Sequence, residues 1–408
     1  LRIARESDPV LLVAYDSSTE TSETRNPEAR VGMNKDRRGK PAVKLLVLYS
    51  LASRRPLAYA RRPGNVPDVL SVGNAMRQLQ ALTDKRVALV MDGGFSSEEN
   101  FGTVLRAHGQ VLARAKLSWR WVREQADACL GRLSSAASIL PGDLGVHGTT
   151  VRLTREFPYT RAYASRRKGL RAGDTDRFRR RVYLHVYYDS ERREREDRDL
   201  MERLFEVRGL VEEGTPLDGR AEGIRDRYLD VRTRGGRVTA TLRKDAATRA
   251  CRLNGVFALV SDKIKDPSQA LESYRQREWI EDYNERLKQD AGGHTARTGS
   301  PECLNGRLFA QFLAMCYIED LHQRLRVMKS QLGRPNGDAA HDLGENLDAE
   351  RALKRWLEKR SLWRTLVWFD AHDTVEVSTD IRRRRWNTET VRRDRMLLEK
   401  LGVSKSKD

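Results

Sequence analysis

The stretch Tyr274-Arg-Gln-Arg277-Glu-Trp-Ile-Glu281-Asp-Tyr-Asn-Glu-Arg-Leu-Lys288 places polar side chains on one stripe of a predicted helix. The offsets from Tyr274 to the other three numbered residues are 277 − 274 = 3, 281 − 274 = 7 and 288 − 274 = 14. At roughly 100° per residue, all four side chains fall within an arc of about 60°. The stretch therefore predicts a helix that presents a carboxylate together with two cations and a phenol. A solvated helix face with ion pairs is the alternative.

Two further carboxylates follow apolar runs that predict buried strands. The run Pro9–Tyr15 ends on Asp16, and the run Arg86–Met91 ends on Asp92. An Asp at a strand end is usually a turn or cap residue. However, neighbouring parallel strands lie about 4.8 Å apart, so two such carboxylates can share a metal ion. Three carboxylates can hold two divalent cations about 3.5 to 4 Å apart, which makes Asp16, Asp92 and Glu281 the candidate metal ligands.

The spacing Tyr-x2-Arg-x3-Glu-x6-Lys resembles the signature of bacterial insertion-sequence transposases of the DDE type. The resemblance continues in Gly32–Tyr49 and in Arg55–Val69, which look like the second and third strands of these enzymes and the turn that follows. The expected order is strand, strand, strand, helix, strand, helix, strand, with the last strand at Val111–Leu117. We therefore expect an α/β fold: a ribonuclease H-like mixed sheet with flanking helices, interrupted by a β-rich insert and followed by a helical C-terminal tail.

The resemblance implies a reaction and a set of site residues. Asp16, Asp92 and Glu281 would be the catalytic residues and would bind two Mg²⁺ ions, with Mn²⁺ as a substitute. The activity would be metal-dependent cleavage at transposon ends and strand transfer into target DNA, by in-line attack on a phosphodiester. Tyr274 and two cations, Arg277 and Lys288, would hold phosphates at the transposon terminus. The expected partners are double-stranded DNA and a second copy of the chain when it is synapsed on DNA.

The gap between the second and third carboxylates is 281 − 92 = 189 residues, which is too long for one connection. Loops beyond about 15 residues without their own structure are uncommon. We expect the first part of the catalytic core at 1–117 and a β-rich insert with a charged helix at 118–254. The second part of the core, with the glutamate helix, is expected at 255–332, a linker at 333–347 and a helical tail at 348–408. In the resembling family, such an insert helps to grip the transposon end.

Composition is consistent with a DNA-binding protein. Lys and Arg total 77 against 58 Asp and Glu, a net charge of +19 that favours a polyanionic partner. Basic residues concentrate at 161–181, where Arg166, Arg167 and Lys168 are predicted to bind DNA; a solvated stretch is the alternative. The sequence has no long apolar run and no C-x2-C pair, so we expect a cytoplasmic, nucleoid-associated protein with reduced cysteines and no membrane partner.

Two features depart from the family pattern. Leu1 is not a methionine and only 16 − 1 = 15 residues precede Asp16, so we expect either an unusual start codon or the downstream part of a longer gene. Asp92 is followed by Gly93 and Gly94, where relatives often carry an arginine, so no phosphate contact is expected from that position. Two other interpretations remain: a ribonuclease H-like nuclease that cuts without strand transfer, and an inactive basic DNA-binding remnant of a truncated transposase.

Overall fold

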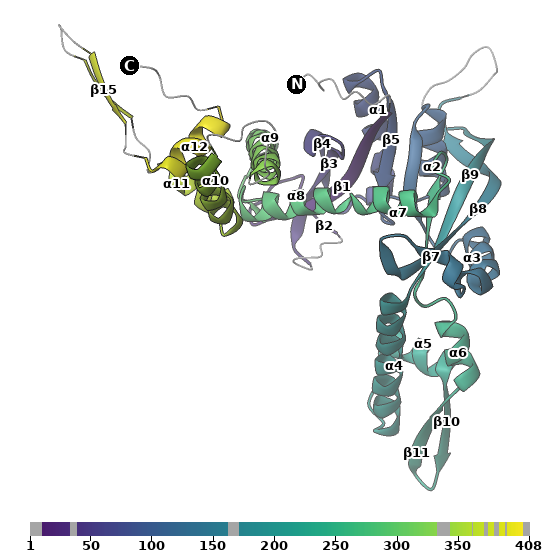
Figure 1. The fold of residues 1–408 in the computed structure, drawn as a ribbon. Coiled ribbons are helices and arrows are strands. Elements are labelled where there is room, and N and C mark those ends of the chain that lie inside the picture. The colour runs from purple at the N-terminus through teal and green to yellow at the C-terminus, as the bar shows by residue number, and fades with distance from the viewer. Residues whose placement is uncertain are drawn as a thin grey trace. The chain divides into compact units, whose positions relative to one another are not determined.

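The computed structural model describes residues 10–32, 39–161, 171–332, 343–360, 362–370, 374–378, 383–387 and 390–402. The chain forms two compact units, Leu1–Arg307 and Leu308–Asp408. Figure 1 shows the elements of both units, which are treated separately below. The five-part division expected from the sequence stays a prediction.

A large mixed sheet forms the centre of the first unit. Its strands follow the order β2-β3-β1-β5-β6-β12-β9-β8-β7, with β4 paired to β3 and β13 paired to β1. The pairs β1–β5 and β5–β6 are parallel, whereas β1–β3 and β3–β4 are antiparallel. The strands are β1 (Val10–Ser22), β2 (Arg30–Val31), β3 (Pro41–Ser50), β4 (Arg55–Pro63), β5 (Arg86–Met91), β6 (Gln110–Ala115), β7 (Ile139–Leu140), β8 (Asp143–Thr160), β9 (Thr175–Asp189), β12 (Val256–Ser261) and β13 (Thr295–Ala296).

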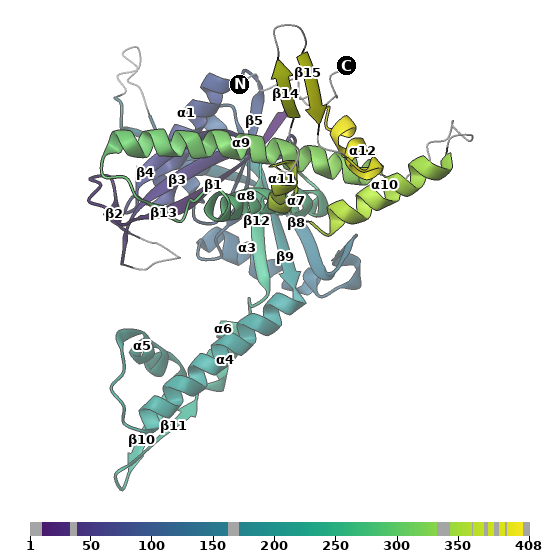
Figure 2. The ribbon, with the colours of Figure 1, turned by 90° about the vertical axis from the view of Figure 1, so that its left-hand side faces the viewer.

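Helices cover both faces of this sheet. One face is covered by α1 (Val72–Leu82), α2 (Glu98–Arg106) and α3 (Arg120–Leu133), which pack on alternate strand residues such as Val13 and Leu89. The 3₁₀ turn η1 (Asp68–Ser71) precedes α1. The short η2 (Ala136–Ser138) follows α3. On the other face, α7 (Pro267–Arg275) and α8 (Glu278–Gln289) lie across the strands (Figure 2). There the ring of Tyr283 on α8 meets Tyr49 of β3 with centroids 5.7 Å apart.

The predicted ribonuclease H-like layout is confirmed. The chain runs through β1, β3, β4, α1, β5, α2 and β6 in the expected order, and these five strands lie side by side as β4-β3-β1-β5-β6. Nearly every residue of β3 and β5 is buried, because helices cover both faces of the sheet, and this explains why β5 was recognisable as a continuous apolar run. Ser97 caps α2, since its side chain accepts a hydrogen bond from the backbone N–H of Asn100.

Two local predictions were wrong. The first strand does not end at Asp16, because its antiparallel partner β3 continues to pair with it, from Asp16 opposite Val47 to Thr21 opposite Ala42. The stretch from Tyr274 to Lys288 is not one regular helix, since α7 ends at Arg275 and α8 begins at Glu278.

The junction between these two helices is a tightened turn. Gln276 and Arg277 keep right-handed helical angles, with φ/ψ of −56/−14° and −60/−22°. The backbone N–H of Arg277 donates to the carbonyl of Tyr274, and that of Ile280 donates to the carbonyl of Arg277, both at 3.0 Å. These bonds span three residues, as in a 3₁₀ helix, so the chain keeps its direction while its period shortens.

A smaller cluster of elements follows β9. It contains α4 (Ser190–Glu212), α5 (Gly219–Tyr228), the antiparallel pair β10 (Leu229–Arg234) and β11 (Arg237–Leu242), and α6 (Lys244–Cys251). Val207, Leu229 and Ala240 form its apolar core. In Figures 1 and 2 these elements lie together away from the main sheet. The charged helix expected within 118–254 is present as α4, and β11 is one of the strands of this region.

The second unit is mainly helical. It comprises the part of α9 (Pro301–Gln331) that follows Arg307, together with α10 (Leu343–Glu358), α11 (Leu362–Asp370), the hairpin of β14 (Thr374–Ser378) and β15 (Arg383–Asn387), and α12 (Arg392–Lys400). Leu325, Leu353, Leu357 and Leu397 belong to its apolar core. In the described parts of the whole chain, no helix is both long and apolar enough to cross a membrane.

Candidate active site

Two of the three predicted carboxylates lie next to each other on the sheet. Tyr15 of β1 is opposite Met91 of β5, so the positions that follow, Asp16 and Asp92, are neighbours on adjacent parallel strands. Tyr15 and Met91 belong to the core under α1, α2 and α3. Because side chains alternate along a strand, Asp16 and Asp92 point to the opposite face, toward α7 and α8.

Arg277, at the junction of α7 and α8, contacts all three carboxylates. Its guanidinium lies 3.7 Å from Oδ1 of Asp16 and 3.9 Å from Oδ1 of Asp92, and it also donates a hydrogen bond to Glu281. Only 12% of the Arg277 side chain is exposed, against 51% for Glu281. The hydroxyl of Tyr274 donates a hydrogen bond to Oδ1 of Asp92 at 3.3 Å. The structure therefore brings together Asp16, Asp92, Glu281, Tyr274 and Arg277, all predicted as site residues.

The two aspartates differ in their proton affinities. Burial raises the pKa of Asp16 to about 6, against the opposing effect of Arg277. Burial also acts on Asp92, but Arg277, the backbone N–H of Gly93 and the Tyr274 hydroxyl outweigh it and lower the pKa of Asp92. Among the described residues, Arg277 is the cation in direct contact with all three carboxylates, and when these are ionised the four groups together carry a net charge of 1 − 3 = −2. The site therefore favours additional positive charge.

Asn284 is a site residue that the sequence did not predict. It is buried on α8, and its Nδ2 donates a hydrogen bond to Oδ2 of Asp16 at 3.0 Å. Its Oδ1 is buried and accepts no hydrogen bond from the described residues. The sequence feature that could have identified Asn284 is its position three residues after Glu281, which puts both side chains on neighbouring turns of the same helix.

The donor set fits divalent cations such as Mg²⁺, which prefer oxygen ligands. Three carboxylates converge around a single cation, and one of them, Asp16, is largely buried. In the described residues, however, no group of three or more His, Cys, Asp or Glu side chains is close enough to hold a metal ion. The guanidinium of Arg277 instead lies within 4.0 Å of a carboxylate oxygen of each of the three residues.

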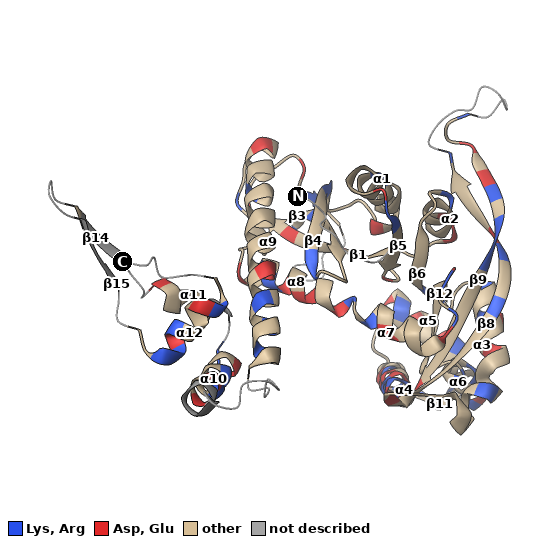
Figure 3. Cartoon of the chain, turned by 45° about the horizontal axis from the view of Figure 1, so that its top comes forward, with Lys and Arg blue, Asp and Glu red and all other residues tan. Residues whose placement is uncertain are grey.

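Of the remaining predicted DNA-binding residues, one lies within the described part of the chain and three lie outside it. Lys288 lies half-buried in the last turn of α8. Arg166, Arg167 and Lys168 fall in 162–170, outside the described residues. The strands on either side of that segment carry basic residues on one exposed face: Arg152 of β8 and Arg177, Arg179 and Arg181 of β9. Figure 3 shows several blue bands, and some red ones, along β8 and β9.

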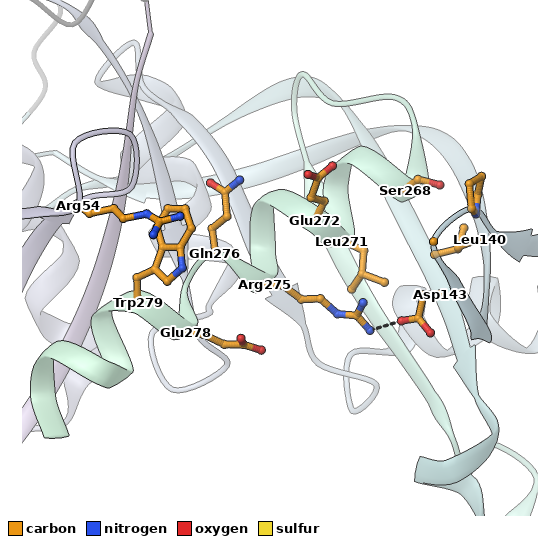
Figure 4. A pocket seen from close by; sticks show the side chains of 12 residues that line it. Arg54, Leu140, Asp143, Ser268, Leu271, Glu272, Arg275, Gln276, Glu278 and Trp279 are labelled. Carbon is orange, nitrogen blue, oxygen red and sulfur yellow. Dashed lines mark ion pairs between the residues drawn. The ribbon is translucent and has the colours of Figure 1, made fainter. Parts of the chain in front are cut away.

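A separate pocket of about 680 Å³ lies beside the α7–α8 junction. Gln276 and Glu278, which flank Arg277 in the sequence, line this pocket together with Trp279 (Figure 4). The guanidinium of Arg54 stacks on the Trp279 ring, 3.5 Å from its centroid. The pocket contains none of the three carboxylates, so it is distinct from the candidate active site.

A ribonuclease H-like sheet with two aspartates on adjacent parallel strands, and a glutamate helix across them, defines the DDE class of nucleic-acid enzymes. The family model of the transposase DDE domain matches residues 11–317. The chain therefore belongs to the transposase DDE domain family.

Comparison with solved structures gives a more distant similarity. The cryo-EM structure of the piggyBac transposase synaptic complex with hairpin DNA is similar with a TM-score of 0.40 and 10% sequence identity, over 91% of this chain. The matched region is 59% of that transposase, so this chain spans less than two thirds of its length. No curated protein sequence matches the chain.

Proposed function

We propose that this chain is a DNA transposase that catalyses metal-dependent cleavage at transposon ends and strand transfer into target DNA. One observation carries the proposal: Asp16 and Asp92 are neighbours on parallel strands, and the helix of Glu281 lies across them so that all three contact Arg277. A surface without a binding or catalytic role rarely gathers carboxylates from distant parts of the sequence, because their mutual repulsion must be offset.

Asp16, Asp92 and Glu281 would hold two Mg²⁺ ions, with Mn²⁺ as a substitute. When bound, the ions would activate the attacking water or 3′-hydroxyl and stabilise the leaving oxygen of the phosphodiester. Asn284 would keep the Asp16 carboxylate oriented, because its Nδ2 already donates to Oδ2 of that carboxylate.

Tyr274, Arg277 and Lys288 would contact DNA phosphates next to the carboxylates. Arginine suits this role because its planar guanidinium can bind a phosphate with two parallel hydrogen bonds. The exposed basic face of β8 and β9, with Arg166, Arg167 and Lys168 in the segment between these strands, would extend the contact along the DNA backbone. The partners would be transposon-end and target duplexes, with a dimer forming on synapsed ends, in the bacterial cytoplasm and nucleoid.

A plasmid assay tests the carboxylates without knowledge of the transposon ends. We expect the full chain to nick supercoiled plasmid when Mn²⁺ or Mg²⁺ is present. Asp16→Ala, Asp92→Ala and Glu281→Ala should each abolish nicking while DNA binding persists. Glu285→Ala is the matched control, because Glu285 is exposed on the same helix one turn after Glu281. Loss of nicking in Glu285→Ala with activity retained in Glu281→Ala would reassign the third carboxylate.

A second assay separates the transposase from its rivals. The DNA that flanks the gene would be searched for terminal inverted repeats, and a duplex with that end and a free 3′-hydroxyl would be incubated with plasmid. A joined product supports transposition. Nicking without any joined product would support a nuclease, and DNA binding without nicking would support an inactive remnant.

A further inference from the structure

Arg114 of β6 lies beside Asp92. It belongs neither to the predicted helix from Tyr274 to Lys288 nor to the carboxylates that follow the predicted strands. Met91 of β5 is opposite Ala113 of β6 in the parallel register, so the next positions, Asp92 and Arg114, are neighbours. Ala113 and Ala115 belong to the core under α1, α2 and α3. Arg114 therefore points to the face that carries the carboxylates. The order across this face is Asp16, Asp92, Arg114.

The glycine after Asp92 leaves room for this side chain. A Cβ added to Gly93 would lie 3.6 Å from Cδ of Arg114, so the arginine stem lies against a position that has no side chain. Arg114 is one of the positive charges that lower the pKa of Asp92 against the effect of burial, after Arg277. Its guanidinium is thus close enough to act on the site electrostatically.

Arg114 lacks the partners that the other arginine of the site has. Among the described residues, it makes no ion pair within 4.0 Å and no side-chain hydrogen bond, although it is half-buried. A guanidinium carries five N–H donors in a fixed fork, and leaving them unpaired in a partly buried position is unfavourable. The geometry of that fork matches two oxygens of a phosphate group.

We propose that Arg114 binds a phosphate of the DNA strand that crosses the Asp16–Asp92 site, on the side of Asp92 away from Asp16. This inference rests on the proposed function and adds a DNA contact to it. A strand passing over Asp92 meets Arg277 at the α7–α8 junction and Arg114 on the sheet. Arg114 holds the phosphate next to the reacting one, so it is a DNA-positioning residue that takes no part in metal binding.

The binding test uses the full chain, a blunt-ended duplex, EDTA and a range of NaCl concentrations, with fluorescence anisotropy as the readout. Arg114→Gln keeps most of the stem over Gly93 and removes the charge. We expect its affinity to fall about tenfold and its salt slope to decrease by roughly 0.9, the value for one lost phosphate contact. Arg123→Gln is the charge-matched control, because Arg123 is exposed on α3, which packs on the opposite face of the sheet.

Arg114→Lys separates a contact from a packing role. Lysine restores the charge, so the slope should return to the wild-type value while affinity stays severalfold weaker, since an ammonium cannot bind a phosphate as a planar fork does. Thermal unfolding of each variant checks that the fold is intact. The inference would be overturned if Arg114→Gln had the same DNA affinity and the same salt slope as Arg123→Gln. It would also be overturned if Arg114→Lys folded normally but did not restore the wild-type salt slope.

Plasmid nicking provides the second readout. Arg114→Gln should raise the DNA concentration at half-maximal rate about tenfold, change the rate at saturating DNA less than threefold, and leave the Mn²⁺ requirement unchanged. An altered Mn²⁺ requirement would place Arg114 in the metal site and contradict the assignment. If the wild-type chain binds DNA but does not nick it, the proposed function fails while the binding test of Arg114 still stands.

Discussion

Replacing Asp16 with Asn should stabilise the metal-free protein at neutral pH, with a pH dependence that identifies the cause. Burial raises the pKa of Asp16 to about 6 from an ordinary value of 3.8, a shift of about 2 units. At about 1.4 kcal/mol per unit, ionising this carboxylate costs the folded state about 3 kcal/mol above pH 6. Asparagine cannot ionise and keeps an oxygen acceptor, so Asp16→Asn avoids the cost.

The sign follows from the raised pKa. Below pH 4, Asp16 is protonated in both the folded and unfolded states, so the free energies of unfolding of wild type and Asp16→Asn should nearly agree. Between pH 4 and 6 only the unfolded state ionises readily, and the wild type loses stability as pH rises. Above pH 6 the difference should level off at about 3 kcal/mol.

Urea unfolding in EDTA at pH 4.5, 5.5 and 7.5 measures this difference. With a slope of about 3 kcal/mol per molar, the midpoint should differ by roughly 1 M at pH 7.5 and by about a third of that at pH 4.5. The exposed Asp84→Asn should show no such trend. A difference that stays constant with pH, or a variant less stable than wild type at pH 7.5, would refute the claim that burial destabilises the charged form of Asp16.

Other substitutions test neighbouring groups. Arg277→Gln should raise Mn²⁺ affinity about tenfold in the absence of DNA, measured by titration calorimetry, because the guanidinium no longer competes for the carboxylates; unchanged affinity would contradict this. Asn284→Ala should raise the Mg²⁺ concentration for half-maximal nicking about tenfold, since Asp16 loses its orienting donor; an unchanged requirement counts against that role. Burial lowers the pKa of His185 to about 4, so the contribution of this residue to stability is full above pH 6.5 and is lost as pH drops toward 4. His185→Gln should flatten this acid-induced loss in urea titrations, and an equally steep loss would show that other groups cause it.

The parts of the fold that local patterns encode were predictable. Buried strands such as β5 are short apolar runs, and Asp92 follows β5 as expected. The end of β1 was not predictable, because the five residues from Ser17 to Thr21 are kept extended by pairing with β3. The sequence of β1 itself carries no sign of that pairing. Helical periodicity identified the stripe from Tyr274 to Lys288 but could not show the 3₁₀ turn at Gln276 and Arg277, whose residues have ordinary helix-forming side chains.

The candidate site shows the same division between local and long-range information. Asp16, Asp92 and Glu281 could be predicted because each sits in a recognisable local pattern and their order matches a family. Arg114 has no such pattern, since only the β5–β6 register places it beside Asp92. Arg277 was expected on DNA phosphates, whereas the structure without DNA places it on the carboxylates.

The contacts of Arg277 with the carboxylates and its proposed contact with a DNA phosphate are physically connected. Two unit charges 4 Å apart interact by about 4 kcal/mol at an effective dielectric constant of 20, so a divalent ion between Asp16 and Asp92 would repel the guanidinium by about twice that amount. The side chain would then need another anion, and a DNA phosphate over the site is the nearest one that the proposed reaction supplies. Metal and DNA would therefore favour each other's binding, and by linkage each would raise the other's affinity by the same factor. In Arg277→Gln this mutual effect should largely disappear. The metal ion would no longer have a guanidinium to displace, and the DNA phosphate would no longer have one to bind. Equal coupling in wild type and variant would show that the carboxylates alone link the two ligands.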